Sequence, residues 1–93
     1  MVIQLYDYAP TRSVRCRWIF QEAGLDFETI DSTNLFGTPA LKKVHPLGAL
    51  PAMTVDGISL FESAAICTYI GDLVPEKGLV APSGTWERAL HDQ

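Results

Sequence analysis

Two hydroxyl residues stand where they could stabilise a negative charge. Thr11 and Ser13 lie at the start of a helical pattern, directly after a loop at residues 7–10 that follows the first strand-like segment. The first amides of a helix have no partner within the helix, and the helix dipole adds partial positive charge at that end. A thiolate held there is stabilised, and a hydroxyl donor lowers the pKa of the thiol further. Each hydroxyl can instead be an ordinary N-cap, and the sequence leaves both roles open.

A second group of residues is suited to binding the backbone of a small peptide. Glu62 and Ser63 open an apolar helix, where Ser63 and nearby amides can bind a carboxylate and Glu62 can bind an ammonium group. A cis bond between Leu50 and Pro51 would turn the Leu50 backbone outward, free to pair with an extended peptide. The alternatives are an ordinary helix cap at Ser63 and a trans bond at Pro51. Arg12 either adds positive charge beside the hydroxyls or remains solvated.

Other kinds of reactive centre are not indicated. His45 has no second histidine or cysteine at ligand spacing, so no metal site is predicted. Cys16 and Cys67 lie far apart in the sequence, inside predicted helices, and are interpreted as two buried, reduced thiols of a cytosolic protein. The absence of a Cys-x-x-Cys motif argues against a dithiol oxidoreductase.

The elements that must position these residues follow from hydrophobic periodicity and turn signals. Strands are predicted at residues 2–6 and 26–30, and helices at residues 11–23, 38–44 and 62–73. Gly24 is the expected left-handed stop of the first long helix. A strand, a helix and a strand joined by short links form a right-handed unit with parallel strands.

A β-hairpin is the strongest local signal. Asp56-Gly57 suits a two-residue type I′ turn, and apolar and β-branched residues flank it on both sides. The turn sets the register, with Val55 opposite Ile58, Thr54 opposite Ser59 and Met53 opposite Leu60. The element order β-α-β-α-β-β-α therefore predicts an α/β domain with a four-stranded mixed sheet and helices on both sides, the thioredoxin-like arrangement.

Both long helices have more apolar surface than one sheet can cover. Cys16, Phe20 and the apolar residues spaced with them form one face of the first helix, while Val14 and Trp18 point almost the opposite way. Scattered surface apolar residues are one explanation. The preferred interpretation is that both helices pack on something outside these 93 residues.

The end of the chain predicts the start of a second domain. Residues 1–75 form the α/β domain, residues 76–84 are rich in proline and glycine and form a linker, and residues 85–93 begin a helix with Thr85 as its cap. We expect this helix to be the first part of an all-helical domain that is truncated here.

Composition limits the possible partners. The 93 residues carry a net charge of −4, and their seven Lys and Arg form no long run, which argues against a nucleic-acid partner. No apolar run approaches the roughly 18 residues of a membrane span. The N-terminal segment has no secretion signal, so a cytoplasmic location without membrane attachment is expected.

Three segments carry a resemblance to a known family. They are LYDYAPTRSVRCRWIFQEAGLDFE, HPLGALPAMTVDG and LFESAAICTYIGD. The first is similar to the strand, loop and helix of bacterial members, the second to an Asn-Pro-x-Gly-x-Val-Pro strand entry, and the third to a Glu-Ser-x-Ala-Ile helix. Together they resemble the N-terminal domain of the cytosolic glutathione transferases over nearly the whole chain.

The resemblance implies a binding site for glutathione, the co-substrate of this family. It implies a cis bond before Pro51, backbone contacts from Leu50 to the cysteine of glutathione, and a γ-glutamyl site at Glu62 and Ser63. Arg12 is assigned to the same implied site.

The resemblance also implies an activity. A glutathione S-transferase activates the glutathione thiol, which attacks a small electrophile or a mixed disulfide, and the complete protein is expected to be a homodimer. Thr11 stands where related bacterial enzymes place a serine or threonine, and Ser13, two residues further on, is the alternative.

The sequence departs from the family pattern at Ala49, where a Lys or Gln often binds the glycine carboxylate of glutathione; Lys42 or Lys43 is a possible substitute. The main rival interpretation is a glutathione-transferase-like binding or protein-interaction module without catalysis. A glutaredoxin-like reductase is disfavoured, because Thr11 and Ser13 stand where its cysteine pair would be.

Overall fold

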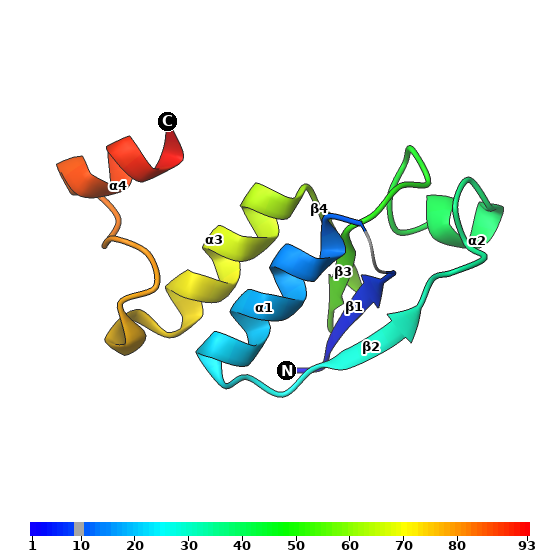
Figure 1. The fold of residues 1–93 in the computed structure, drawn as a ribbon, viewed down its shortest axis with the longest axis horizontal. Helices are drawn as coiled ribbons and strands as arrows, with labels where there is room; N and C mark the ends of the chain where they lie inside the picture. The colour runs from blue at the N-terminus through cyan, green and yellow to red at the C-terminus, as the bar shows by residue number, and fades with distance from the viewer. Residues whose placement is uncertain (9–10) are drawn as a thin grey trace.

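The computed structural model describes residues 1–8 and 11–93, so Ala9 and Pro10 of the predicted loop lie outside the described residues (Figure 1). The elements are β1 (Ile3–Asp7), α1 (Ser13–Ala23), β2 (Glu28–Asp31), α2 (Pro39–Lys42), β3 (Ala52–Val55), β4 (Ile58–Phe61), α3 (Ser63–Leu73), the 3-10 helix η1 (Pro75–Lys77) and α4 (Trp86–Asp92). Every predicted strand and helix is confirmed, with shifted ends. Within the described ranges, no helix has the length and apolar character needed to cross a membrane.

The four strands form one mixed sheet in the order β2-β1-β3-β4. β1 and β2 are parallel, while β3 runs antiparallel to both β1 and β4. The hairpin has the predicted register, with Val55 opposite Ile58. Asp56 and Gly57 have φ values of 50° and 82°, the positive values that a type I′ turn requires. The predicted thioredoxin-like arrangement is therefore confirmed.

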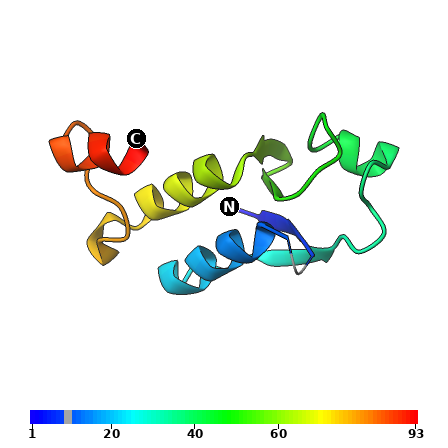
Figure 2. The same ribbon diagram turned by 45° about the horizontal axis from the view of Figure 1, so that its top comes forward.

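The core has a large part and a small part, one on each face of the sheet. On one face, Leu5 and Met53 pack against α1 and α3. Alternation along each strand sends the neighbouring residues to the opposite face, where Tyr6 and Ala52 meet Leu41 of α2. Figures 1 and 2 show α1 and α3 side by side, and α2 at the end of the molecule away from α4.

The surplus apolar surface that was expected on both long helices is present. Val14 and Trp18 on α1 are 39% and 66% exposed, and Tyr69 on α3 is 36% exposed. On the same helices, Phe20 and Ile70 are completely buried against the sheet. Each helix thus buries one apolar face and leaves further apolar residues in contact with solvent.

A close approach of two glycines shapes the loop that leads into β3. Gly48 has a φ of 63°, and its carbonyl accepts a hydrogen bond of 3.0 Å from the Gly37 amide. A Cβ atom at residue 48 would lie 2.9 Å from the Gly37 Cα atom. Left-handed backbone costs other residues about 1–2 kcal/mol. Glycine at residue 48 tolerates the left-handed backbone and leaves room for Gly37. The loops at residues 37 and 48 can therefore lie in direct contact.

The last helix is tied to α3 by an ion pair. Thr85 accepts a hydrogen bond of 3.1 Å from the Arg88 amide, so its predicted role as the N-cap of α4 is confirmed. The Arg88 guanidinium lies 2.8 Å from the Asp72 carboxylate on α3. The guanidinium donates two hydrogen bonds to the Asp72 carboxylate, and these hold the pKa of Asp72 below its ordinary value.

Candidate functional site

Strand register brings the predicted site residues to one edge of the sheet. Tyr6 of β1 is aligned with Ala52 of β3, which is aligned in turn with Phe61 of β4. This row lies at the carboxyl ends of β1 and β4 and at the start of β3. The loop after β1, the Leu50-Pro51 segment and the start of α3 must therefore meet at this edge. Figure 1 shows the first turns of α1 and α3 next to each other, at the end of the helix pair that faces α2.

Ser13, one of the two candidate hydroxyls, is completely buried. Its oxygen lies 2.6 Å from a carboxylate oxygen of Asp7, at the end of β1, and accepts a hydrogen bond of 3.1 Å from the Tyr8 amide. A carboxylate only accepts hydrogen bonds, so the hydroxyl hydrogen of Ser13 points at Asp7. The alternative acceptor, the Tyr8 carbonyl, is 3.3 Å away. Ser13 therefore has no hydrogen left for a ligand.

Thr11, the other hydroxyl, is half-buried, and its oxygen lies 2.6 Å from that of Ser13. Because the Ser13 hydrogen points at Asp7, the hydrogen between the two hydroxyls belongs to Thr11. Thr11 also donates to the Tyr8 carbonyl. Its one hydrogen therefore has two uncharged acceptors in the same loop. A charged acceptor that approaches from solvent would bind this hydrogen more strongly than either of them.

Arg17 balances the charge of Asp7 in this network. A guanidinium nitrogen of Arg17 lies 3.1 Å from the second carboxylate oxygen of Asp7, which is only 8% exposed. Sequence reasoning did not single out either residue. The sequence did contain a signal: Asp7 directly follows the first predicted strand and precedes, by four residues, the predicted helix at residues 11–23. That helix carries Arg15 and Arg17 near its start.

The predicted caps of α1 differ from those observed. The N-cap residue is Arg12, whose side chain is exposed and makes no cap hydrogen bond. The Thr11 hydroxyl instead accepts a hydrogen bond of 3.3 Å from the Ser13 amide, and the Ser13 hydroxyl is bound to Asp7. Ser13 is the first residue of the helix itself, and its oxygen accepts from the Tyr8 amide of the preceding loop, so it does not cap the first turn of α1.

The Leu50-Pro51 bond is cis, as predicted. Pro51 is buried and Leu50 is half-buried against the small apolar cluster around α2. His45 orders the preceding loop, because its ring nitrogen Nδ1 accepts a hydrogen bond of 3.1 Å from the Leu47 amide. The ring of His45 also packs on that of Phe61, with centroids 4.4 Å apart. This structural use of His45 was not expected from the sequence.

The start of α3 has an unusual backbone. Glu62 is the N-cap residue, with φ 78° and ψ 119°, and no side chain caps the helix. Such angles are sparsely populated by residues with a Cβ atom and cost about 1–3 kcal/mol. The side chain of Glu62 is exposed and that of Ser63 is half-buried. The first turn of α3 therefore offers uncapped amides together with a carboxylate and a hydroxyl.

The assembled edge combines complementary groups for a zwitterionic peptide. The Glu62 carboxylate can bind an ammonium group, and the amides at the start of α3 can bind a carboxylate. Lys42 and Lys43 are exposed on the α2 side of the same edge, whereas Ala49 carries no charge. Within residues 1–8 and 11–93, no three His, Cys, Asp or Glu side chains come together in a way that could hold a metal ion.

Comparisons with known proteins agree with this arrangement. Residues 1–72 match the family described as glutathione S-transferase, N-terminal domain. Protein LigF of Sphingobium sp. (strain NBRC 103272 / SYK-6) is 32% identical over 99 residues, covering 96% of this chain and 37% of that protein. Glutathione S-transferase Z2 of Arabidopsis thaliana is 33% identical over 95 residues, covering 98% of this chain and 42% of that protein.

Solved structures agree as well. A sphingomonad glutathione S-transferase complexed with glutathione superposes with a TM-score of 0.80 at 31% identity, over 92% of this chain and 45% of that chain. The present chain thus spans less than half the length of these relatives. The family match covers most of the sequence, from the first strand through α3. The chain therefore belongs to the glutathione S-transferase family.

Proposed function

We propose that this chain binds glutathione and lowers the pKa of its thiol, as the glutathione-binding part of a glutathione S-transferase. The observation that carries the proposal is the row formed by Tyr6, Ala52 and Phe61. Through this row, the hydroxyl loop, the Leu50-Pro51 segment and the start of α3 share one edge of the sheet. Solved relatives with bound glutathione superpose closely on the chain, which supports the same ligand here.

The three segments divide the recognition of the tripeptide. The Leu50 backbone pairs with the cysteine residue of glutathione, and Pro51 holds that segment against the sheet. Glu62 binds the ammonium group of the γ-glutamyl end, while Ser63 and the amides of α3 bind its carboxylate. Arg12, exposed at the N-cap of α1, adds positive charge to a site whose ligand is anionic overall.

Thr11 is the hydroxyl that donates to the glutathione sulfur in this proposal. Ser13 is excluded from that role because its hydrogen is directed at Asp7. Lowering a thiol pKa by about 2 units requires about 2.7 kcal/mol of thiolate stabilisation. A hydrogen bond to a charged group contributes about 1.5–3 kcal/mol and a helix N-terminus up to about 2 kcal/mol. Thr11 and the start of α1 therefore suffice without a catalytic cation.

We further propose that residues 1–75 are the glutathione-binding domain, residues 76–84 a linker and residues 85–93 the first turns of a helical domain. The exposed faces of α1 and α3 at Trp18 and Tyr69 support this division, as do relatives more than twice as long. In the complete protein, a cytoplasmic homodimer, the helical domain would bind the electrophile, and the thiolate would attack that electrophile or a mixed disulfide.

The domain proposal predicts that the chain of 93 residues binds a hydrophobic dye through the exposed faces of α1 and α3. A Trp18→Gln variant should bind markedly less dye, because Trp18 is the most exposed large apolar residue of these two helices. Fluorescence titration measures the difference. A chain that binds no dye and remains monomeric would contradict the proposal that these faces are covered by a further domain.

Titration with glutathione at neutral pH tests the proposed function. We expect binding by calorimetry together with ultraviolet absorbance of a thiolate. S-methylglutathione is the matched control, because it should bind without the thiolate signal. Absence of glutathione binding would refute the proposal.

Binding without a thiolate would instead favour a non-catalytic binding module. This second candidate is supported by Ala49, which supplies no side chain for the glycine carboxylate. A binding module should bind glutathione weakly and show no thiolate absorbance at neutral or mildly alkaline pH. That outcome distinguishes it from a transferase.

A further inference from the structure

We propose that Arg17 is a positioning residue for activation of the glutathione thiol, and that it acts through Asp7. Asp7 anchors the loop that carries Thr11, and Arg17 compensates the charge of this buried carboxylate so that a thiolate can form nearby. The inference rests on the proposed transferase function and adds two residues to which that function assigns no part. In this proposal, neither of the two touches the ligand.

Both carboxylate oxygens of Asp7 are engaged by α1. One accepts a hydrogen bond of 2.6 Å from the Ser13 hydroxyl, and the other lies 3.1 Å from a guanidinium nitrogen of Arg17. Ser13 and Arg17 are four residues apart in the helix, so a single face of α1 presents both groups to the end of β1. A carboxylate that is removed from water depends on such donors. Two donors from one helix therefore hold Asp7 in place.

The contact between Asp7 and Ser13 fixes the loop that carries Thr11. Ser13 accepts a hydrogen bond of 3.1 Å from the Tyr8 amide, and its oxygen lies 2.6 Å from that of Thr11. The Thr11 amide in turn donates a hydrogen bond of 2.9 Å to the Tyr8 carbonyl. The position of the Thr11 hydroxyl thus depends on Asp7 through Ser13.

The same anchor places a negative charge close to the proposed thiolate. Two oxygen–oxygen contacts of 2.6 Å each connect Asp7 to Thr11, so a sulfur bound to the Thr11 hydroxyl lies within about 10 Å of the carboxylate. This separation is about one Debye length at physiological ionic strength, so salt screens the repulsion only partly. A like charge raises the pKa of a thiol. Without compensation, Asp7 would therefore oppose the activation that Thr11 provides.

Arg17 supplies the compensating positive charge. Its side chain is 37% exposed and lines a hollow in the surface together with Asp7, Tyr8 and Asp31. Asp31 of β2 is aligned with Asp7 of β1, and hydrogen bonds from Thr33 hold the pKa of Asp31 below its ordinary value. Asp31 therefore adds a second negative charge to this hollow. Loss of Arg17 would leave two neighbouring carboxylates without the guanidinium that lies between α1 and the sheet.

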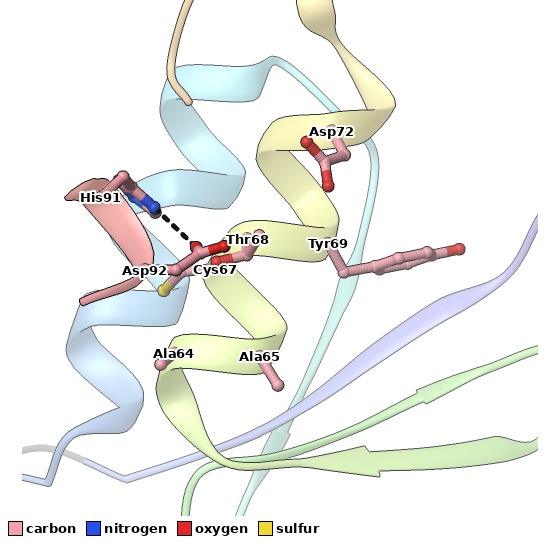
Figure 3. A pocket seen from close by; sticks show the side chains of 8 residues that line it. All are labelled: Ala64, Ala65, Cys67, Thr68, Tyr69, Asp72, His91 and Asp92. Atoms are coloured by element: carbon pink, nitrogen blue, oxygen red, sulfur yellow. Dashed lines mark hydrogen bonds and ion pairs between the residues drawn. The ribbon is translucent and has the colours of Figure 1, made fainter. Parts of the chain in front are cut away.

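The helices carry further charged and titratable groups. Those in the first turns of α1 are the exposed Arg12 and Arg15 and the buried thiol of Cys16. Asp72 on α3 and Asp92 on α4 line a separate hollow between those two helices (Figure 3). Substitution of Arg17 therefore changes the balance of charge at Asp7 and leaves that second hollow as it is.

Thiolate absorbance of the glutathione complex as a function of pH tests the proposal. We expect Arg17→Gln to raise the pKa of the bound thiol by about 1 unit, so the thiolate fraction at neutral pH falls about tenfold. Affinity for S-methylglutathione should be unchanged, because Arg17 does not touch the ligand. Arg17→Lys keeps the charge and should restore most of the signal. Arg15→Gln is the matched control, since it removes an exposed arginine of the same helix and should leave the thiol pKa nearly unchanged.

Variants of Asp7 separate charge compensation from a purely structural ion pair. Asp7→Asn should lower the thiol pKa, because the like charge is gone and Arg17 remains. Asp7→Asn combined with Arg17→Gln removes both charges, so the thiol pKa should return close to that of the unaltered chain. A pair that only supports the fold predicts instead that all three variants weaken binding of glutathione and S-methylglutathione alike.

The outcomes also distinguish this proposal from the transferase function on which it rests. A thiol pKa that Arg17→Gln leaves unchanged, or that rises in both Arg17→Gln and Asp7→Asn, would overturn the role of Arg17 alone. In that case the unaltered chain would still form a thiolate with glutathione. A complex of the unaltered chain without any thiolate would overturn both proposals.

Discussion

Replacement of Thr11 by valine is expected to raise the pKa of the bound glutathione thiol by about 1–2 units. Valine has the same shape but cannot donate the hydrogen bond of about 1.5–3 kcal/mol that stabilises the thiolate. The thiolate fraction at neutral pH, and with it the rate of attack on an electrophile, should fall about 10–100-fold. The measurement is the thiolate absorbance of the glutathione complex as a function of pH. Thr11→Ser, which keeps the hydroxyl, should restore the signal.

Ser13→Ala is the matched comparison, because it removes the neighbouring hydroxyl. Its loss leaves one oxygen of the buried Asp7 carboxylate without the Ser13 donor, although Arg17 still contacts the other oxygen, so the free energy of unfolding should decrease by about 1–3 kcal/mol. The pKa of the bound thiol should change much less than it does in Thr11→Val. If Ser13→Ala raises the thiol pKa as much as Thr11→Val does, Ser13 is the donor and the hydrogen assignment in this loop is wrong.

Substitution of Glu62 should affect stability and binding in opposite directions. Glu62→Gly removes the conformational penalty at φ 78°, which is about 1–3 kcal/mol for a residue with a Cβ atom. The greater freedom of glycine in the unfolded chain offsets about 0.5–1 kcal/mol of that gain. We expect a net increase in the free energy of unfolding, measured by denaturant titration. Affinity for glutathione should fall about 10–100-fold, because a charge-assisted hydrogen bond to the ammonium group is lost.

Glu62→Gln separates the two effects. Glutamine has nearly the same size and keeps the backbone penalty, but it has no negative charge. Its stability should match that of the unaltered chain, while its affinity for glutathione should fall as far as that of Glu62→Gly. A glycine variant that is less stable than the unaltered chain would show that the Glu62 side chain supports the fold itself. Unchanged affinity in Glu62→Gln would remove this residue from the binding site.

Much of the candidate site was predictable because its segments carry local signals. Asp56-Gly57 dictates the hairpin turn, and the turn sets the register that aligns Ala52 with Phe61. The roles of Leu50 and Glu62 were predicted from the residue types and assigned to glutathione by the family resemblance, and the Glu62 variants above test the second of them. The cis bond at Pro51 was also implied by resemblance and is present.

The positive φ of Glu62 was not predicted, since no residue type in that segment indicates it. Glu62 alone connects the extended strand β4, which ends at Phe61, to the helix α3, which begins at Ser63, and its backbone makes the change of direction between them. The contacts of His45 were missed for a similar reason. Its ring meets Phe61, and the packing of a loop on a strand end sixteen residues away leaves no periodic signal in the sequence.

The amino-acid sequence by itself determined the order of the elements, the hairpin register and the two apolar faces of α1 and α3, because periodicity and turn chemistry act over a few residues. Only the tertiary structure decided which hydroxyl is available to a ligand and which cysteine is accessible. Both outcomes depend on neighbours brought together by packing: Asp7 accepts the hydrogen bond of the Ser13 hydroxyl, and the packing of α1 on the core buries Cys16 while Cys67 on α3 is only half-buried. A hydroxyl has one hydrogen, and its direction is set by the nearest strong acceptor in space.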